Sequence, residues 1–151
     1  MNRYAFLLES LRDLDCSLRK LGTRLYVVKG NPLEQIQRLC KKWDVKHLTF
    51  EADTEPYALA RDTRVREFCS SSGICVSSHS SHTLHDPFKY IASAKGKLPK
   101  SYQGFNTLFA QMGAPRRPEA PPAPLPSSFV DSSEDFDVPT LEAMGYPPLQ
   151  G

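Results

Sequence analysis

Leucines recur along residues 3–21 at alternating steps of four and three positions, with charged residues between them. The stripe consists of Leu7, Leu11, Leu14, Leu18 and Leu21. This spacing places the leucines on one face of an amphipathic helix, which we therefore expect over residues 3–21. Gly22 follows the stripe and suits a left-handed turn that ends the helix. The next segment, "RLYVVKG", is a short β-branched run bounded by glycine and predicts a strand.

Predicted helices and strands then alternate, with only a few residues between them. Asn31 can cap a second helix and Pro32 suits its first turn, with Glu34 at the position of a capping box. The runs "VKHLTFE" and "ICVSS" predict a second and a third strand, with a third helix over residues 55–72 between them. Such alternation is typical of a parallel sheet covered by helices on both faces. The pattern predicts an α/β fold, part of a doubly wound, Rossmann-like parallel sheet.

The C-terminal part of the sequence has a different character. Short helices are expected from Pro87 to about residue 94, with Asp86 as the cap, and over about residues 102–112. Most of the 13 prolines lie beyond the first of these helices, and proline interrupts both helices and strands. We therefore expect a partial α/β domain over residues 1–112 and a proline-rich, disordered interdomain linker over residues 113–151.

The composition narrows the class of protein. A length of 151 residues suits one domain, and a net charge of +2 is too small to predict nucleic-acid binding from electrostatics alone. The four cysteines lie in or beside apolar runs at irregular spacings, which indicates free, buried thiols and a reducing compartment. The apolar runs are shorter than the roughly 20 residues that span a bilayer, and the charged N-terminus is not a secretory signal. We expect a protein of the nucleus and/or cytoplasm, with no membrane partner.

Three carboxylates, Glu51, Asp53 and Glu55, fall within five positions directly after an apolar run. Ligands of open α/β sheets bind outside the carboxyl ends of the strands, so these residues have the location of a pocket rim. Carboxylates this close together could also act as a catalytic acid/base pair or bind a metal ion. The simplest reading is an acidic helix start, in which Thr54 is the cap and the carboxylates favour the positive end of the helix.

The histidines suggest a second candidate site. Cysteine and histidine are the usual ligands of structural zinc, and zinc ligands can have the spacings found in this set: Cys75, His79, His82 and His85. No further cluster completes such a site, so His82 is expected to be a hydrogen-bonded structural residue. Gly30 is isolated and does not form a glycine-rich phosphate loop. Four basic residues on the two sides of the boundary at residue 113 form either a small basic patch, which would lie near DNA in a full-length protein, or ordinary solvated charges: Lys97, Lys100, Arg116 and Arg117.

Four separate stretches of the sequence resemble, in the same order, the photolyase–cryptochrome family. They are "RYAFLLESLRDLDCSLRKLGTRLYVVKGNP", "LTFEADTEPYALARD", "SHTLHDP" and "DVPTLEAMGY". The similarity runs over residues 2–118, resumes near Val138, and is closest to the animal branch, the (6-4) photolyases and animal cryptochromes. The sequence departs from this pattern at His85, where relatives more often have tyrosine, and at "KLPKSYQGF".

The resemblance implies a larger protein with an N-terminal α/β domain, a connector, and a C-terminal helical domain that holds FAD and the electron-transfer tryptophans. It implies that this chain covers the middle and end of the α/β domain plus the connector, without the first two strands and without catalytic or FAD-binding residues. Trp43 is then a core residue. In some members the edge of this sheet holds an antenna chromophore, a folate or a deazaflavin. Asp53 and Glu55 stand in the matching "DTEPY" segment and are the candidate residues for the antenna rim.

The resemblance leaves the activity of the parent protein open. The parent is either a blue-light DNA photolyase, which repairs DNA, or a non-catalytic cryptochrome that regulates transcription through clock or signalling proteins. A free-standing Rossmann-like nucleotide-binding protein is a third reading. For residues 1–151 alone we expect no activity and no stable fold, because the missing strands would leave "LYVVK" without a neighbour and two sheet edges open.

Overall fold

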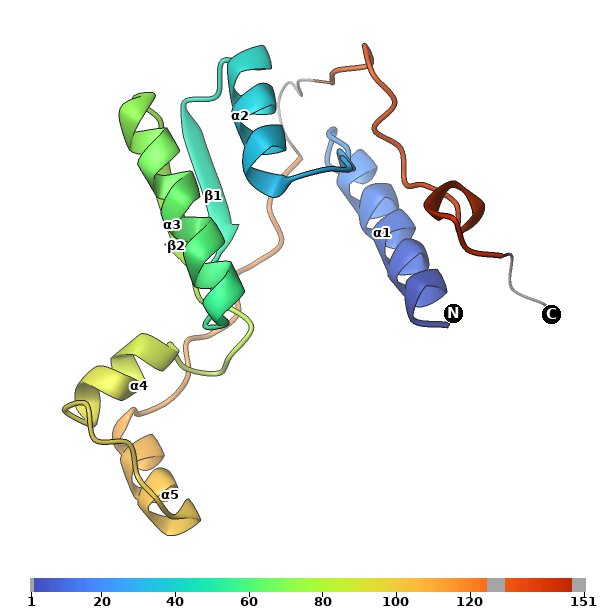
Figure 1. Ribbon diagram of the computed structural model, residues 1–151. Helices are drawn as coiled ribbons and strands as arrows, with labels where there is room; N and C mark the ends of the chain where they lie inside the picture. The colour runs from blue at the N-terminus through green and yellow to red at the C-terminus, as the bar shows by residue number, and fades with distance from the viewer. Residues whose placement is uncertain (1, 125–129, 148–151) are drawn as a thin grey trace. The chain divides into compact units, whose positions relative to one another are not determined.

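The computed structural model describes residues 2–124 and 130–147 (Figure 1). Contacts between residues define two compact units, one within residues 1–29 and 120–151 and the other within residues 30–119. In the part of the chain that is described, no helix has the length and apolar character needed to cross a membrane.

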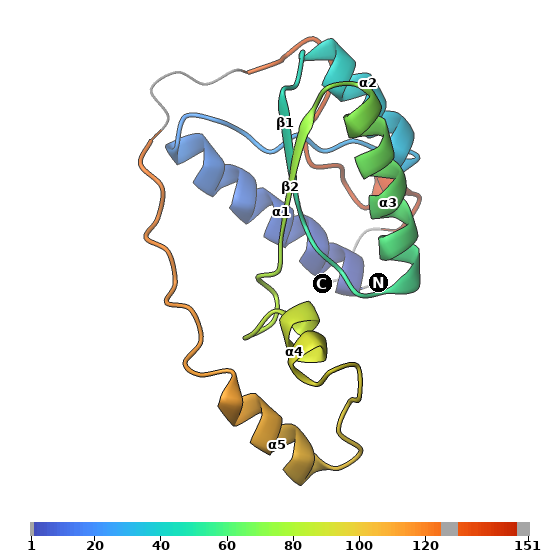
Figure 2. The same ribbon diagram turned by 90° about the vertical axis from the view of Figure 1, so that its left-hand side faces the viewer.

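The parallel sheet belongs to the unit within residues 30–119. The order of its elements is α2 (Pro32–Lys42), β1 (His47–Glu51), α3 (Pro56–Ser71) and β2 (Cys75–His79). The strands pair in parallel, with His47 opposite Cys75 and Glu51 opposite His79. α3 connects the strands and packs on β2, α2 packs on α3, and both helices lie on the same side of the strands (Figure 2). The predicted α/β fold with a parallel sheet is confirmed.

Local sequence explains where these elements begin and what they bury. The Asn31 side chain accepts the backbone N–H groups of Leu33, at 3.0 Å, and Glu34, at 3.4 Å, which confirms the predicted cap of α2. One face of α3 is buried along its length, through Ala58, Asp62, Val65 and Cys69. Cys40 of α2 is buried as well. The core of this unit therefore lies along the inner face of α3.

Two shorter helices follow β2, as predicted. They are α4 (Pro87–Ser93) and α5 (Tyr102–Gln111). Asp86 caps α4 by accepting the N–H of Phe88 at 2.9 Å, and Ser101 caps α5 by accepting the N–H of Gly104 at 3.1 Å. The Tyr90 hydroxyl donates to the backbone oxygen of Phe105 at 3.2 Å, which joins the two helices.

The first helix, α1 (Asn2–Lys20), belongs to the other unit. Gly22 follows it with a φ of 84°, the left-handed turn expected from the sequence. The leucine stripe is only partly buried, because Leu7 and Leu14 are 47% and 45% exposed. Ala5 and Leu8 are the buried residues of the helix instead. The periodicity thus predicted the helix correctly but not which of its side chains are covered.

The segment "RLYVVKG" does not form the predicted strand. The described residues contain a two-stranded sheet of β1 and β2, and residues 23–29 form neither helix nor strand. A strand needs a ladder of backbone hydrogen bonds to a neighbour. Here the N–H of Val27 donates instead to the backbone oxygen of Phe136, at 3.0 Å. This prediction was wrong because strand formation depends on a pairing partner and not on the β-branched run alone.

The predicted linker is only partly irregular. Residues 115–124 contain neither helix nor strand, as the prolines suggest, but residues 130–147 make defined contacts and include the short helix η1 (Glu142–Met144). Phe136 is 1% exposed and packs edge-on against Tyr26, with ring centroids 5.2 Å apart. The prediction of disorder therefore does not hold for residues 130–147, because an apolar side chain in them is buried.

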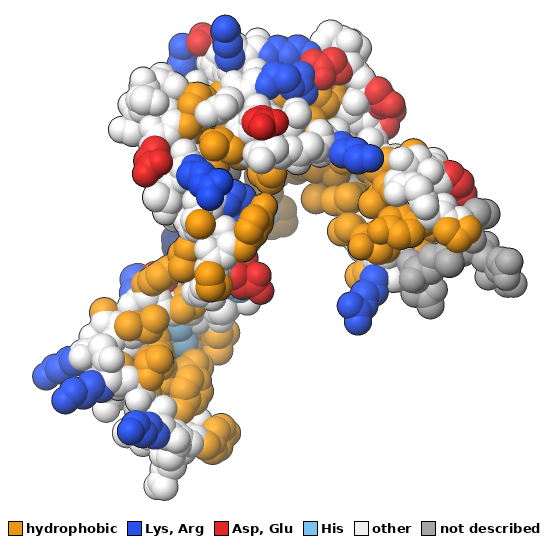
Figure 3. Space-filling view, in the orientation of Figure 1, with side chains coloured by type: hydrophobic (Ala, Val, Ile, Leu, Met, Phe, Trp, Pro, Cys, Tyr) orange, Lys and Arg blue, Asp and Glu red, His pale blue; other side chains and the backbone are white. Residues whose placement is uncertain are grey.

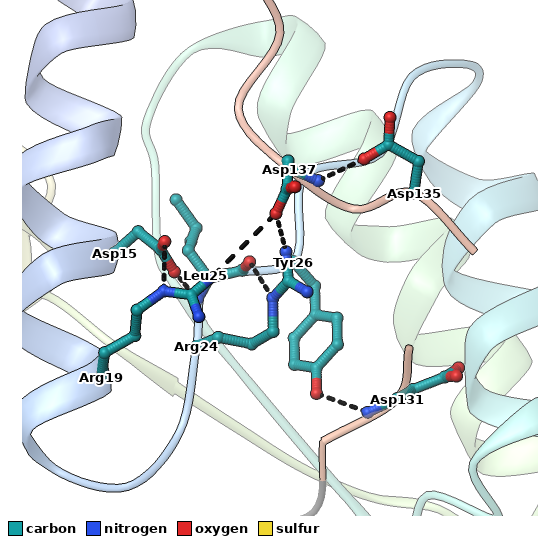
Figure 4. A network of polar contacts seen from close by, with 8 residues as sticks. All are labelled: Asp15, Arg19, Arg24, Leu25, Tyr26, Asp131, Asp135 and Asp137. Carbon is teal, nitrogen blue, oxygen red and sulfur yellow. Dashed lines mark hydrogen bonds and ion pairs between the residues drawn. The ribbon is translucent and has the colours of Figure 1, made fainter. Parts of the chain in front are cut away.

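Polar contacts reinforce this attachment (Figure 4). Arg24 pairs with Asp137, and the Tyr26 hydroxyl accepts the N–H of Asp131 at 2.9 Å. On the other side, the Asp15 carboxylate of α1 accepts the N–H of Leu25 at 2.8 Å. The segment after α1 is thus fixed between the helix and the C-terminal residues.

Candidate functional site

The carboxyl ends of β1 and β2 lie at the same edge of the sheet, since the strands are parallel. Glu51 is the last residue of β1, and Ser81 and His82 follow the end of β2. Oε1 of Glu51 accepts the backbone N–H of Ser81 at 2.5 Å and that of His82 at 3.1 Å. Its Oε2 accepts the Ser81 hydroxyl at 2.7 Å, and Nδ1 of His82 lies 2.8 Å from Oε1. One carboxylate therefore holds the loop that follows the neighbouring strand.

These contacts determine the charge of Glu51. They lower its pKa to about 2, mainly through the backbone N–H of Ser81, then through the Ser81 hydroxyl and the His82 side chain. General acid/base catalysis needs a pKa near the working pH. Glu51 is thus a permanently ionised anchor for the loop and not a group that exchanges protons near neutrality. His82 is the hydrogen-bonded structural residue that the sequence predicted.

Asp53 and Glu55, the two predicted rim residues, lie in the turn between β1 and α3. Oδ1 of Asp53 accepts the N–H of Thr54 at 2.6 Å and that of Glu55 at 3.1 Å. Glu55 is the N-cap residue of α3 and makes no capping bond with its side chain. The predicted cap was therefore wrong: Asp53, not Thr54, satisfies backbone N–H groups at this turn, because its carboxylate reaches the next two amides.

A cleft of about 230 Å³ lies beside this turn, between the start of α3 and the segment after β2. Asp53 lines it together with Asp62, Arg66, Ser78 and Phe88, whereas Glu55 is exposed outside its lining. Arg66 donates to the Ser78 hydroxyl at 2.5 Å and its guanidinium lies 5.0 Å from the ring centre of Phe50. The lining of the cleft thus combines the guanidinium group of Arg66, which is held in place by these contacts, with the carboxylates of Asp53 and Asp62.

The sequence interpretation missed Asp62 and Arg66. Asp62 is 8% exposed, and its carboxylate pairs with Arg61 at 2.7 Å. Extending the buried face of α3 toward its N-terminus would have found it, since Asp62 lies four positions after Ala58 and three before Val65. Arg66 carries no comparable sequence pattern, because its role depends on Ser78 in the next strand.

The fit of an antenna chromophore to this cleft is limited by size and by existing contacts. Pockets that enclose a drug-sized ligand measure roughly 300–1,000 Å³, more than this cleft. The carboxylates of Asp53 and Asp62 already have partners, as does Arg66. The described residues therefore do not form a pocket that encloses a chromophore, and Asp53 lines an open cleft.

The other candidate residues are separate from this edge. No group of three or more His, Cys, Asp or Glu residues in the described part of the chain has the arrangement of a metal site. His79 and Cys75 are exposed, while His85 contacts the ring of Phe109 in α5, with centroids 5.0 Å apart. Trp43 is half-buried at the end of α2. The four basic residues on the two sides of residue 113 are all exposed: Lys97, Lys100, Arg116 and Arg117.

The cysteines only partly match the prediction of buried free thiols. All four are free. Cys40 and Cys69 are buried, and loss of hydration raises the pKa of both thiols. Cys16 and Cys75 are exposed. The prediction of burial was wrong for these two, because an apolar sequence neighbourhood does not place a side chain in the core.

Known proteins with similar sequences are photolyases and cryptochromes. A "(6-4)DNA photolyase" of Arabidopsis thaliana is 42% identical over 97% of this chain and 27% of its own length. "Cryptochrome-2" of Gallus gallus is 38% identical over 97% of this chain and 26% of its own length. The chain thus spans about a quarter of the length of these relatives.

Solved structures share the fold. A cryptochrome of Synechocystis superposes with a TM-score of 0.76 over 96% of this chain and 29% of its own, at 23% identity. A bacterial class III photolyase from Agrobacterium tumefaciens gives 0.70 over 95% and 29%, also at 23% identity. The family model described as DNA photolyase matches residues 1–126. The chain therefore belongs to the DNA photolyase family, and its parallel sheet corresponds to the N-terminal α/β domain of photolyases and cryptochromes.

Proposed function

We propose that this chain forms part of the α/β domain of a blue-light flavoprotein whose FAD is held outside residues 1–151. Proteins of this family generally bind FAD and an antenna chromophore. The proposal is supported above all by the alignment of 97% of this chain with 27% of the Arabidopsis (6-4) DNA photolyase. The chain alone is then inactive, and the light-driven electron transfer takes place in the rest of the protein.

The role of this chain in such a protein is to build the edge of the sheet beside the antenna. Glu51 fixes the loop after β2 at the end of β1, and this favours a rigid edge. Asp53 lines the adjacent cleft and Glu55 begins the next helix, so Asp53 is the better rim contact. A bound folate or deazaflavin supplies light absorption and passes the energy to FAD. The protein residues position it and exclude water from one side.

The reaction of the whole protein has two candidate forms. The 42% identity to a (6-4) DNA photolyase favours a light-driven DNA repair enzyme, with damaged DNA as the partner. The 38% identity to a cryptochrome favours a photoreceptor or clock protein that acts through protein partners. We place both forms in the nucleus and/or cytoplasm, because free cysteines suit a reducing compartment.

A chimera tests the proposal without relying on the isolated chain. This chain replaces the aligned segment of the Arabidopsis (6-4) DNA photolyase, whose own flanking residues are kept. A chimera that retains FAD and repairs damaged DNA only in light supports the proposed role. A chimera that folds but holds no FAD contradicts it.

A further inference from the structure

Proline recurs at every third position in the segment that follows α5. The prolines of this repeat are Pro115, Pro118, Pro121 and Pro124. A polyproline II helix has about three residues per turn, so prolines at this spacing lie along one of its faces. The repeat is a feature of one continuous stretch of sequence and lies outside the edge that carries Glu51.

The sequence also favours the polyproline II conformation over the whole of residues 114–124. Proline fixes its own φ and disfavours the helical region for the residue before it. In this stretch only Arg116 and Glu119 are neither proline nor directly followed by proline. These two residues are joined to each other, because Nη2 of Arg116 lies 2.9 Å from Oε1 of Glu119, one turn further along. Local constraints therefore hold the segment without help from the rest of the chain.

The segment is accessible to a partner. Residues 114–124 contain neither helix nor strand, and each of them is exposed. Ala120 and Ala123 directly precede prolines of the repeat, so small side chains flank the proline face. Arg117 precedes Pro118 and lies on the same side as these alanines, since it is three positions before Ala120. Among the described residues Arg117 has no ion-pair partner, whereas Arg116 is paired with Glu119.

These features are those of a peptide ligand. A preformed polyproline II helix loses little conformational freedom on binding, and the aromatic-lined grooves of SH3, WW and EVH1 domains exploit this. The charge of Arg117 is complementary to an acidic side chain at the rim of such a groove. We propose that residues 114–124 bind a protein domain whose groove is lined by aromatic rings and carries a carboxylate that faces Arg117.

Other exposed apolar side chains provide a control for this proposal. They gather over α4 and α5 (Figure 3) and include Tyr102, which is 80% exposed. Tyr102 is in a helix and does not belong to the proline repeat, so it should not enter a polyproline groove. Tyr102→Ala therefore measures non-specific adhesion of apolar surface and should leave specific binding unchanged.

The test is a titration of the complete 151-residue chain with isolated SH3, WW and EVH1 domains, followed by fluorescence anisotropy. We expect saturable binding to at least one of these domains. Pro121→Ala interrupts the repeat and should raise the dissociation constant about tenfold. Pro122→Ala is the matched control, because it removes the neighbouring proline from a different face and should have a much smaller effect. Arg117→Gln should weaken binding more at low salt than at high salt.

The same titration with the chimera of this chain and the Arabidopsis photolyase makes the result independent of the stability of the isolated chain. Since the segment is held by local constraints, the chimera should give the same dissociation constant. Absence of saturable binding to all three kinds of domain overturns the proposal. So do equal effects of Pro121→Ala and Pro122→Ala, or binding that is seen with the isolated chain but not with the chimera. An unchanged salt dependence in Arg117→Gln overturns the assignment of the carboxylate in the groove.

Discussion

Glu51 and His82 are 31 positions apart in the sequence, yet Oε1 of Glu51 lies 2.8 Å from Nδ1 of His82. The same carboxylate accepts two hydrogen bonds from Ser81. These contacts connect the ends of two parallel strands at the edge where α/β proteins bind ligands. The stability of this edge therefore depends on one ionised side chain.

The carboxyl group of Glu51 should titrate near pH 2 instead of at its ordinary value of 4.5. Because the folded-state pKa is the lower one, its contribution to stability is present above about pH 4.5 and is lost as the pH falls toward about 2. Carboxyl NMR titration measures the pKa directly, and hydrogen exchange of the Ser81 and His82 amides follows the loop. Ser81→Ala should raise the pKa only in part, since the backbone N–H of residue 81 remains. Titration of Glu51 near 4.5 in the folded chain would show that the loop is not held this way.

Substitution of Phe136 should detach the C-terminal segment from the segment after α1. Phe136→Ala removes a side chain that is 1% exposed, and such changes cost about 3–5 kcal/mol. Asp137→Asn removes an ion pair whose carboxylate is 72% exposed, and should cost less than about 1 kcal/mol. Hydrogen exchange of the Val27 amide reports the attachment, because that amide donates to the backbone oxygen of Phe136.

Phe6→Ala is the matched control for this comparison, since Phe6 is 72% exposed and lies in α1. It should leave the exchange of Val27 almost unchanged. Equal effects of Phe6→Ala and Phe136→Ala on the exchange of the Val27 amide would show that the burial of Phe136 does not attach the C-terminal segment.

The four thiols should react in two classes. Cys16 and Cys75 are exposed, whereas burial both shields Cys40 and Cys69 and raises the pKa of their thiols. Since the thiolate is the reactive form, a disulfide reagent should modify two cysteines quickly and two slowly. In denaturant all four should react at similar rates. In a chain whose circular dichroism still shows the helices, a single fast phase without denaturant is the outcome that this arrangement does not allow.

The isolated chain should unfold gradually on heating. In the described residues seven apolar side chains are buried, while fourteen large apolar ones are exposed. A two-stranded sheet is marginal by itself, so the core supplies little cooperativity. Circular dichroism and calorimetry should give a broad transition with a small enthalpy. A sharp transition with an enthalpy typical of a 151-residue protein would disprove this expectation.

Local chemistry made much of the fold predictable. Asn31 and Asp86 cap their helices and Gly22 ends α1, because each of these features depends on a few neighbouring residues. The segment containing Val27 was misassigned as a strand, since a strand needs a partner that its own sequence does not reveal. The burial of Phe136 was missed for a similar reason, because its contact with Tyr26 joins distant parts of the sequence.

The candidate site was predictable to a similar degree. The position of Asp53 and Glu55 after β1 followed from the alternation of helices and strands. The contacts of Glu51 with Ser81 and His82 required knowledge of which strands are neighbours. Asp62 could have been found from the helical spacing of α3, whereas Arg66 could not.

The visible absorption spectrum of the purified chain, after incubation with FAD and removal of the unbound flavin, tests the central claim most directly. That claim is that residues 1–151 form part of a photolyase-type α/β domain whose flavin lies elsewhere. The account predicts that no flavin absorption remains with the chain, while the chimera with the Arabidopsis photolyase retains it. A compact chain that keeps one flavin per molecule would contradict the account.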